Sequence, residues 1–178
     1  MYVIAICGPL ESAVNELAKK LRLKVETPIT ILDESSYRVT NSIDYEKLKK
    51  DIETKEGIIL LVGHSLYIDD SLKKFLGESL KIKLFLETSP ESCLANFLRR
   101  KLAEDVKKNI DEYNQTIKPF NDEVNLTKKY ADVVIPEKGN HEIILNLLHS
   151  SILAQSAPEN EEQKKPTTSA FFSSNRLY

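Results

Sequence analysis

Few cysteines, little excess of charge of either sign and no long hydrophobic run separate this sequence from several classes of protein. The two cysteines, Cys7 and Cys93, stand in apolar stretches without the spacing of metal ligands, so we expect buried thiols in a reducing compartment and no metal site. The 25 basic and 27 acidic residues leave a net charge of -2, which gives no electrostatic basis for binding nucleic acid or a membrane surface. The first apolar run, residues 2–7, is far shorter than the roughly 20 residues that cross a bilayer. The sequence therefore predicts a cytoplasmic protein, with a nuclear one as the alternative.

The length and composition of the chain indicate one folded domain followed by a tail. The chain has 178 residues, of which 41% are hydrophobic and 29% charged, and domains of roughly 100 to 200 residues are the usual expectation. From residue 156 on, Pro, Ser, Thr and charged residues follow one another without a helical or strand period, which is typical of disorder. We expect a domain over residues 1–155 and a disordered tail over residues 156–178.

Apolar runs alternate along the chain with longer charged stretches. Runs rich in β-branched residues favour strands covered on both faces, and the stretches between them carry apolar residues at helical intervals of three and four. This alternation predicts an α/β fold in which helices flank a five-stranded parallel sheet. The runs are residues 2–7, 29–32, 57–63, 81–88 and 131–136.

The segment GPLESAVN, residues 8–15, lies where a phosphate-binding loop would be found, between a strand and a helix. Against the motif G-x-x-x-x-G-K-S/T, Gly8 matches the first glycine, while Ala13, Val14 and Asn15 replace the second glycine, the lysine and the hydroxyl residue. Val14 supplies neither charge nor donor. The side-chain charge of the loop changes from about +1 in the motif to -1 here, through Glu11.

Downstream motifs resemble those of the uridine kinase family of P-loop nucleoside kinases. YNQTIKPFNDEVNLTKKYADVVIP, residues 113–136, is similar to the family pattern Y-x-x-x-V-K-P-x-x-x-x-F-V-x-P-x-K-K-Y-A-D-x-I-I-P. GIILLVGHSLYIDDSL (57–72) and KIKLFLETSPESCL (81–94) match family segments in the same order. The resemblance covers nearly all of residues 1–152, marks a divergent member, and implies a P-loop kinase-like three-layer sandwich.

The resemblance also assigns a catalytic base and a substrate contact. ESSYR, residues 34–38, falls on the family's D-S-F-Y-K, which implies Glu34 as general base on a nucleoside 5′-hydroxyl and Tyr37 in the substrate pocket. Asp33 takes the place of the base if the register differs by one. An acidic, Ser-rich turn after a strand is an equally good explanation of these residues.

Two further residues gain roles from the resemblance. Asp44 aligns with the family's Asp that binds the ribose hydroxyls, although it is equally suited to cap a helix that begins at Tyr45. Arg100 is the surviving arginine of the family's lid and the candidate to contact a phosphate, with a solvated helix face as the alternative.

Several family elements are missing. Only one helix fits between Asp44 and Gly57, so the hairpin that holds the pyrimidine base is absent, and Val62 stands where the family has the acid that helps to organise magnesium. The family uses ATP and Mg²⁺ in pyrimidine salvage, but we do not expect this chain to bind ATP with the strength of the family. No residues are assigned to a metal.

The favoured interpretation is therefore an impaired or inactive uridine kinase-like protein that acts by binding or regulation. The alternative is a divergent kinase that transfers the ATP γ-phosphate to a nucleoside 5′-hydroxyl. The partners expected are a nucleoside or nucleotide, a second copy, or an active family member.

Overall fold

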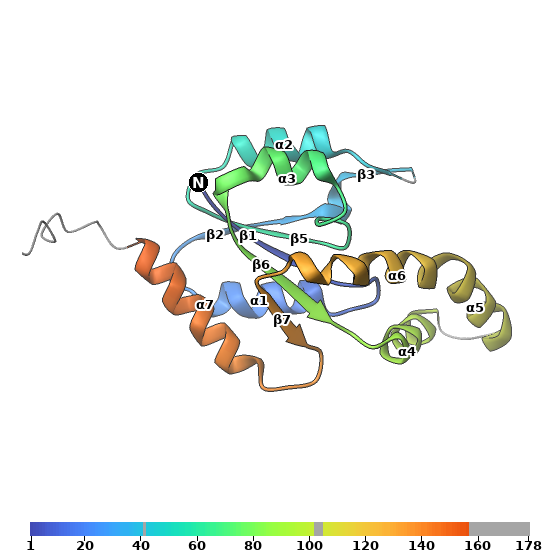
Figure 1. The fold of residues 1–178 in the computed structure, drawn as a ribbon. Coiled ribbons are helices and arrows are strands. Elements are labelled where there is room, and N and C mark those ends of the chain that lie inside the picture. The colour runs from blue at the N-terminus through green and yellow to red at the C-terminus, as the bar shows by residue number, and fades with distance from the viewer. Residues whose placement is uncertain (41, 102–104, 157–178) are drawn as a thin grey trace, which may run out of the picture.

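The computed structural model describes residues 1–40, 42–101 and 105–156. Its centre is the predicted parallel sheet of five strands, and the structure gives their order as β2-β5-β1-β6-β7 (Figure 1). An antiparallel pair of two-residue strands, β3 and β4, follows β2 and was not predicted. The strands are β1 (Tyr2–Cys7), β2 (Ile29–Asp33), β3 (Arg38–Val39), β4 (Ser42–Ile43), β5 (Ile58–Gly63), β6 (Leu80–Glu87) and β7 (Val133–Pro136).

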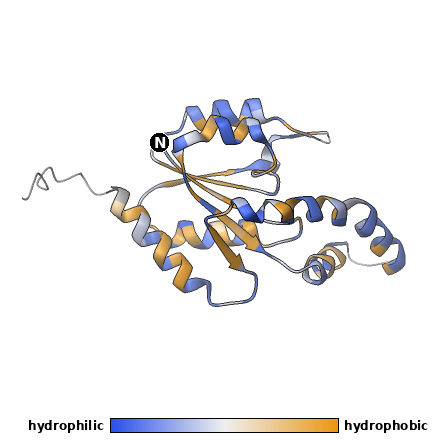
Figure 2. Cartoon of the chain, viewed as in Figure 1, coloured by the Kyte–Doolittle hydropathy of each residue, from blue (hydrophilic) through white to orange (hydrophobic). Residues whose placement is uncertain are grey.

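Helices cover both faces of the sheet. On one face α1 (Val14–Lys24) and α7 (His141–Ser156) pack through buried leucines and isoleucines, which form one hydrophobic core with the strands. On the other face α2 (Tyr45–Glu53), α3 (Asp70–Leu76) and α6 (Lys118–Leu126) enclose a second core. The strands are hydrophobic and fit a sheet covered on both faces, whereas α2 and α5 (Val106–Glu112) are largely hydrophilic (Figure 2). Helix α7 is hydrophobic over much of its length and leaves Ile143, Leu147 and Leu153 exposed.

Helices α4 (Pro90–Arg100) and α5 extend beyond the sheet, and α5 continues through a π-helical turn, η3 (Tyr113–Ile117), into α6 (Figure 1). Cys93, Phe97 and Tyr113 form a small core of their own between these helices. This arrangement places one end of α4 and one end of α6 beside the carboxyl edge of the sheet. The remaining short helices are η1 (Glu34–Tyr37), η2 (Gly77–Ser79) and η4 (Thr127–Tyr130).

Polar side chains cap the starts of two helices. The Asp44 carboxylate accepts the N–H of Lys47 at the start of α2, and the Ser89 hydroxyl oxygen accepts the N–H of Ser92 at the start of α4. Asp44 therefore has the capping role that the sequence left open beside the ribose-binding one.

The cysteine prediction is also confirmed in part, because Cys7 and Cys93 are both buried and free. Burial raises the pKa of each thiol to about 12. Within the described residues, no helix is both long and apolar enough to cross a membrane. The tail predicted over residues 156–178 lies outside the described residues except for Ser156, and it stays a prediction.

We predict that Tyr67→Phe lowers the free energy of unfolding by about 1–2 kcal/mol. The Tyr67 side chain is buried, and its hydroxyl donates to the backbone oxygens of Ala5 in β1 (3.0 Å) and Leu84 in β6 (2.9 Å). The change removes this donor from the sheet interior. Equilibrium urea unfolding measures the loss, and Tyr130→Phe, at a side chain with 46% exposure, serves as the control with a change below about 0.5 kcal/mol. Equal effects of the two changes would contradict the prediction.

Candidate functional site

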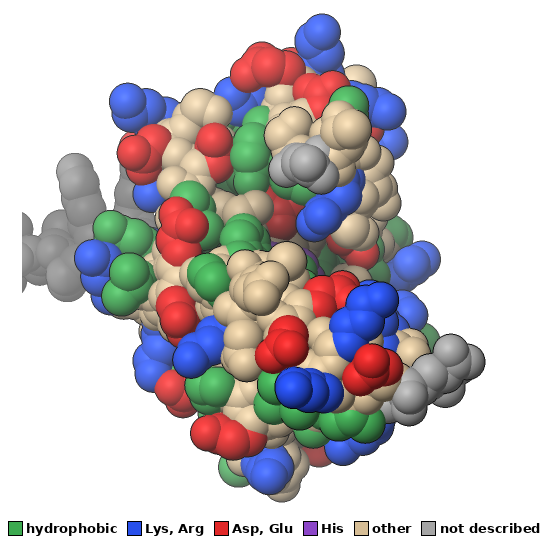
Figure 3. Space-filling view, turned by 90° about the vertical axis from the view of Figure 1, so that its right-hand side faces the viewer, with side chains coloured by type: hydrophobic (Ala, Val, Ile, Leu, Met, Phe, Trp, Pro, Cys, Tyr) green, Lys and Arg blue, Asp and Glu red, His purple; other side chains and the backbone are tan. Residues whose placement is uncertain are grey.

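The loop between β1 and α1 lies at the carboxyl edge of the sheet. Open parallel sheets bind their ligands at this edge. Of the predicted site residues outside this loop, Arg100 contacts it through Glu11, whereas Glu34 contacts the turn after β5 and Asp44 lies at the start of α2. The loop is bordered by α4, by α6 and by the turn after β5, and no side chain caps the N-terminus of α1. The surface over α4, α5 and α6 carries basic and acidic side chains interspersed (Figure 3).

Side chains of the loop itself fill the space beside Gly8. A Cβ added to Gly8 would lie 2.9 Å from a γ-carbon of Val14 and 3.0 Å from Oγ of Ser12. Val14 is 1% exposed and belongs to the core under the sheet, while the Ser12 hydroxyl donates to the Pro9 carbonyl oxygen at 2.6 Å. The position of the motif's lysine is thus a buried apolar side chain.

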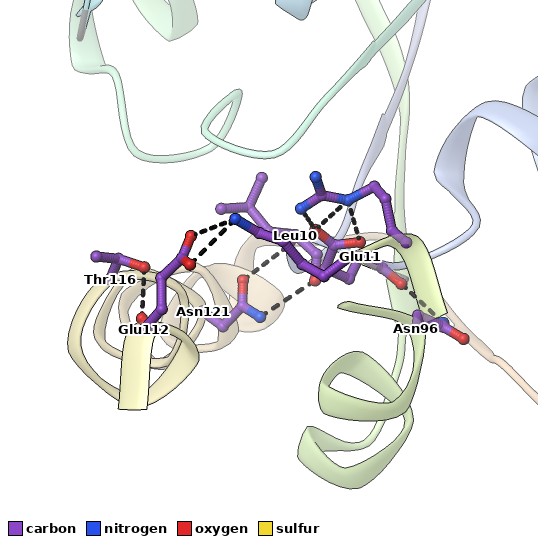
Figure 4. Close-up of polar contacts among 8 residues, drawn as sticks. Leu10, Glu11, Asn96, Glu112, Thr116 and Asn121 are labelled. Atoms are coloured by element: carbon purple, nitrogen blue, oxygen red, sulfur yellow. Dashed lines mark hydrogen bonds and ion pairs between the residues drawn. The ribbon is translucent and has the colours of Figure 1, made fainter. Parts of the chain in front are cut away.

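Two amides hold the loop from outside (Figure 4). Asn121 on α6, which is 4% exposed, accepts the Leu10 N–H through Oδ1 at 2.7 Å and donates through Nδ2 to the Leu10 carbonyl oxygen at 3.2 Å. Asn96 on α4 donates to the carbonyl oxygen of Glu11 at 2.9 Å. Sequence reasoning missed Asn121, although an amide three residues before the buried Val124 was a signal, since both lie on the inward face of α6.

A histidine holds the first residue of the loop. Nδ1 of His64 lies 2.8 Å from the carbonyl oxygen of Gly8, and because a carbonyl can only accept, Nδ1 carries the proton. His64 follows β5, so this contact links the end of β5 to the end of β1.

Arg100, the predicted phosphate contact, is paired with the carboxylate of Glu11. Its Nη2 lies 2.5 Å from Oε1, and its Nε lies 3.2 and 3.3 Å from the two carboxylate oxygens. The hydrogen bonds to Glu11 raise the pKa of Arg100 above its ordinary value. The guanidinium is therefore not simply part of a solvated helix face, because it binds an anion that belongs to the chain.

Glu34, the predicted general base, is 3% exposed and accepts four hydrogen bonds. Oε2 accepts the N–H groups of His64 (2.7 Å) and Ser65 (3.0 Å). Oε1 accepts the hydroxyls of Ser65 (2.7 Å) and Tyr45 (2.8 Å). A carboxylate offers about four acceptor positions, so this arrangement leaves none for a substrate hydroxyl. Glu34 as a base stays a prediction that these contacts disfavour.

A cavity of about 200 Å³ lies beside Glu34, with His64, Ser65 and Tyr45 among the residues that line it. Tyr37, predicted to face a substrate, does not line this cavity. Tyr37 is 7% exposed and packs in the core with α2. Its hydroxyl donates to Asp51 on α2 at 2.8 Å. Burial raises the pKa of Tyr37 to about 12.

The two aspartates near this cavity serve as caps. Asp44 caps α2, and Asp33, the alternative base, accepts the N–H of Ser35 at 2.8 Å at the start of η1. Neither lines the cavity. Ribose binding by Asp44 stays a prediction.

A larger hollow of about 550 Å³ lies between the start of α4, the end of α6 and the loop after β7. Side chains of both signs line it, among them Lys128, Glu137 and Lys138. None of the residues predicted for the site contributes to it. Among the described residues, no three His, Cys, Asp or Glu side chains are grouped so that they could hold a metal ion.

Comparison with known proteins confirms the predicted resemblance. No family model matches the chain. It is 33% identical over 121 residues to a uridine kinase of Listeria welshimeri, covering 61% of this chain and 54% of that protein. It is 29% identical over 117 residues to a uridine kinase of Ligilactobacillus salivarius, covering 64% and 51%. The chain thus spans about half the length of the curated relatives it matches.

Solved structures agree on the fold. The shikimate kinase of Aquifex aeolicus has a TM-score of 0.58 at 18% identity, covering 86% of this chain and 98% of that one. A shikimate kinase of Bacteroides thetaiotaomicron has a TM-score of 0.54 at 14% identity, with coverages of 86% and 98%. The predicted P-loop kinase-like fold is therefore confirmed.

We predict that Gly63→Ala lowers the free energy of unfolding by about 2–3 kcal/mol. A Cβ at Gly63 would lie 2.4 Å from Oε2 and 2.6 Å from Cβ of Glu34, so the buried carboxylate would have to move. Gly139→Ala is the matched control, because the nearest atom to its added Cβ is Cγ of Pro136 at 3.5 Å, an ordinary contact. Urea unfolding compares the two variants, and similar stabilities would show that the Glu34 contacts do not require glycine at this position.

Proposed function

We propose that this chain, a divergent relative of the uridine kinases with the fold of P-loop kinases, does not transfer phosphate and acts by binding. The similarity supports a nucleoside kinase-like protein, and the loss of catalysis is the further step. We place this activity in the cytoplasm, in agreement with the composition.

The observation that carries the proposal is the filled loop. In a working phosphate loop, backbone N–H groups, one lysine and a magnesium-binding hydroxyl stabilise the transferred phosphoryl group. Here Val14 is buried against Gly8, and the Leu10 N–H is taken by Asn121. These residues do not fit a magnesium nucleotide. Loss of one preorganised contact typically costs about 3–4 kcal/mol, or a hundred- to thousandfold in rate.

The state of Glu34 supports the same conclusion. A general base must reach the hydroxyl that it deprotonates, at a heavy-atom distance of about 2.6–3.2 Å. Glu34 directs its oxygens at the turn after β5 and at Tyr45 instead. Its carboxylate holds the cavity wall together and offers no acceptor for a nucleoside 5′-hydroxyl.

The mode of action that follows is binding of a small nucleoside or nucleotide, or pairing with a second copy or an active relative. The cavity beside Glu34, at about 200 Å³, is smaller than the roughly 300–1,000 Å³ of typical ligand pockets. This size disfavours a nucleoside bound beside Glu34, and none of the residues predicted for the site lines the larger hollow of about 550 Å³. The competing function, phosphoryl transfer from ATP to a nucleoside 5′-hydroxyl, is favoured by the similarity in sequence alone.

We predict that the purified protein, with radiolabelled ATP, Mg²⁺ and a panel of nucleosides, turns over less than about a hundredth as fast as ordinary kinases, whose rates are about 1–100 s⁻¹. The physical reason is the absence of a cation and a base at the reacting groups. The uridine kinase of Listeria welshimeri, assayed alongside, is the positive control. Turnover by this chain at ordinary kinase rates would overturn the proposal.

Equilibrium dialysis with labelled ATP is the companion measurement. We expect no saturable binding to this chain at millimolar ATP, whereas the control enzyme binds. Saturable binding without turnover would retain the loss of catalysis and favour a nucleotide as the ligand.

A further inference from the structure

Glu11 has an unfavourable backbone conformation that its surroundings maintain. Its φ is +66°, in the left-handed region that residues with a Cβ seldom adopt. The Asn96 amide donates to its carbonyl oxygen, and the guanidinium of Arg100 holds its carboxylate. Both partners come from α4, so the strained residue is the point at which α4 is attached to the loop (Figure 4).

The contact between Glu11 and Arg100 has the geometry with which arginine binds anionic ligands. Two nitrogens of the guanidinium face the carboxylate, and the group also lies over the Phe97 ring, 5.3 Å from its centroid. Such forked pairs suit carboxylates and phosphates alike. The Glu11 side chain is only 14% exposed, whereas that of Arg100 is 58% exposed, so the carboxylate is enclosed on the loop side.

A second ion pair joins Lys101, which follows Arg100 in the sequence, to Glu112 and does not involve the loop. Lys101 Nζ lies 2.7 Å from Oε1 of Glu112, but these side chains are 33% and 40% exposed and neither comes from the loop. That pair joins Lys101, the residue that follows α4, to α5. It therefore provides a control with the same change of charge close to the same place.

We propose that Glu11 is a built-in anion that occupies an anion-binding site on Arg100, a site that would otherwise accept a phosphate group. The contact keeps α4 against the loop without a ligand and excludes phosphate esters and polyphosphates from the guanidinium. This inference rests on the proposed function, because it explains how the loop between β1 and α1 is held in place without a bound nucleotide. A tethered carboxylate competes at an effective concentration of the order of millimolar, so free phosphate compounds are outcompeted at lower concentrations.

The test compares Glu11→Gln with Glu112→Gln in the full chain, with inorganic tripolyphosphate as the probe in isothermal titration calorimetry. Glu11→Gln keeps the shape of the side chain and removes its charge. We expect it to bind tripolyphosphate at least tenfold more tightly than the wild type, while Glu112→Gln binds like the wild type. Adding Arg100→Gln to Glu11→Gln should abolish the gain.

Hydrogen exchange gives an independent readout. Amides of residues 93–100 should exchange faster in Glu11→Gln than in Glu112→Gln, and tripolyphosphate should restore the slower exchange. Arg100→Gln alone should also speed this exchange, which tests the attachment of α4 even if Glu11→Gln fails to fold.

Three results would overturn the inference: equal tripolyphosphate binding by Glu11→Gln and wild type, a gain that persists without Arg100, or unchanged exchange of α4 in both single variants. ATP turnover by the wild type would overturn the proposed function and not this comparison. The two proposals therefore fail on different measurements.

Discussion

The buried carboxylate of Glu34 is the contact on which the arrangement of the site depends. Its two oxygens accept N–H groups from His64 and Ser65 and two hydroxyls, which joins the end of β2 to the turn after β5. An unpaired carboxylate at 3% exposure would be very costly, so these four contacts must form together. Only a glycine at position 63 leaves room for the carboxylate.

A chain of hydrogen bonds connects Glu34 to the loop between β1 and α1. The backbone of His64 is held by Glu34, and the His64 ring in turn donates to the Gly8 carbonyl oxygen. Beyond Gly8 the loop is fastened by Asn121 and, through Glu11, by Arg100. One polar network therefore runs from the edge strand β2 across the carboxyl ends of the sheet to α4.

The loop between β1 and α1 is stabilised by apolar packing and by an internal ion pair. Burial of a valine side chain contributes about 1.5–3 kcal/mol to stability, whereas a buried lysine without an anion would cost free energy. Val14 packs under the sheet, and Glu11 supplies the negative charge that Arg100 binds. The substitutions are mutually consistent, since apolar packing and an internal ion pair stabilise the loop without a ligand.

Much of the fold followed from local patterns. The five apolar runs became the five parallel strands, and Asp44 caps the helix that its position indicated, because strand propensity and capping depend on neighbouring residues. The differences from the phosphate-loop motif at positions 13–15 could also be identified, once the resemblance to the uridine kinases had aligned residues 8–15 with that motif. These features belong to segments of a few residues, and the order of amino acids defines them.

What only the tertiary structure decided was which distant groups meet. Arg100 and Glu11 are 89 positions apart, and Asn121 and Leu10 are 111 apart, so no spacing rule could pair them. Tyr37 was assigned to a substrate pocket, yet its hydroxyl reaches Asp51 and the ring is buried. The sequence by itself determined an α/β chain whose loop after the first strand departs from the phosphate-loop motif at positions 13–15. Packing of α4 and α6 against the loop determined which groups hold it, because hydrogen bonds and ion pairs depend on distance in space.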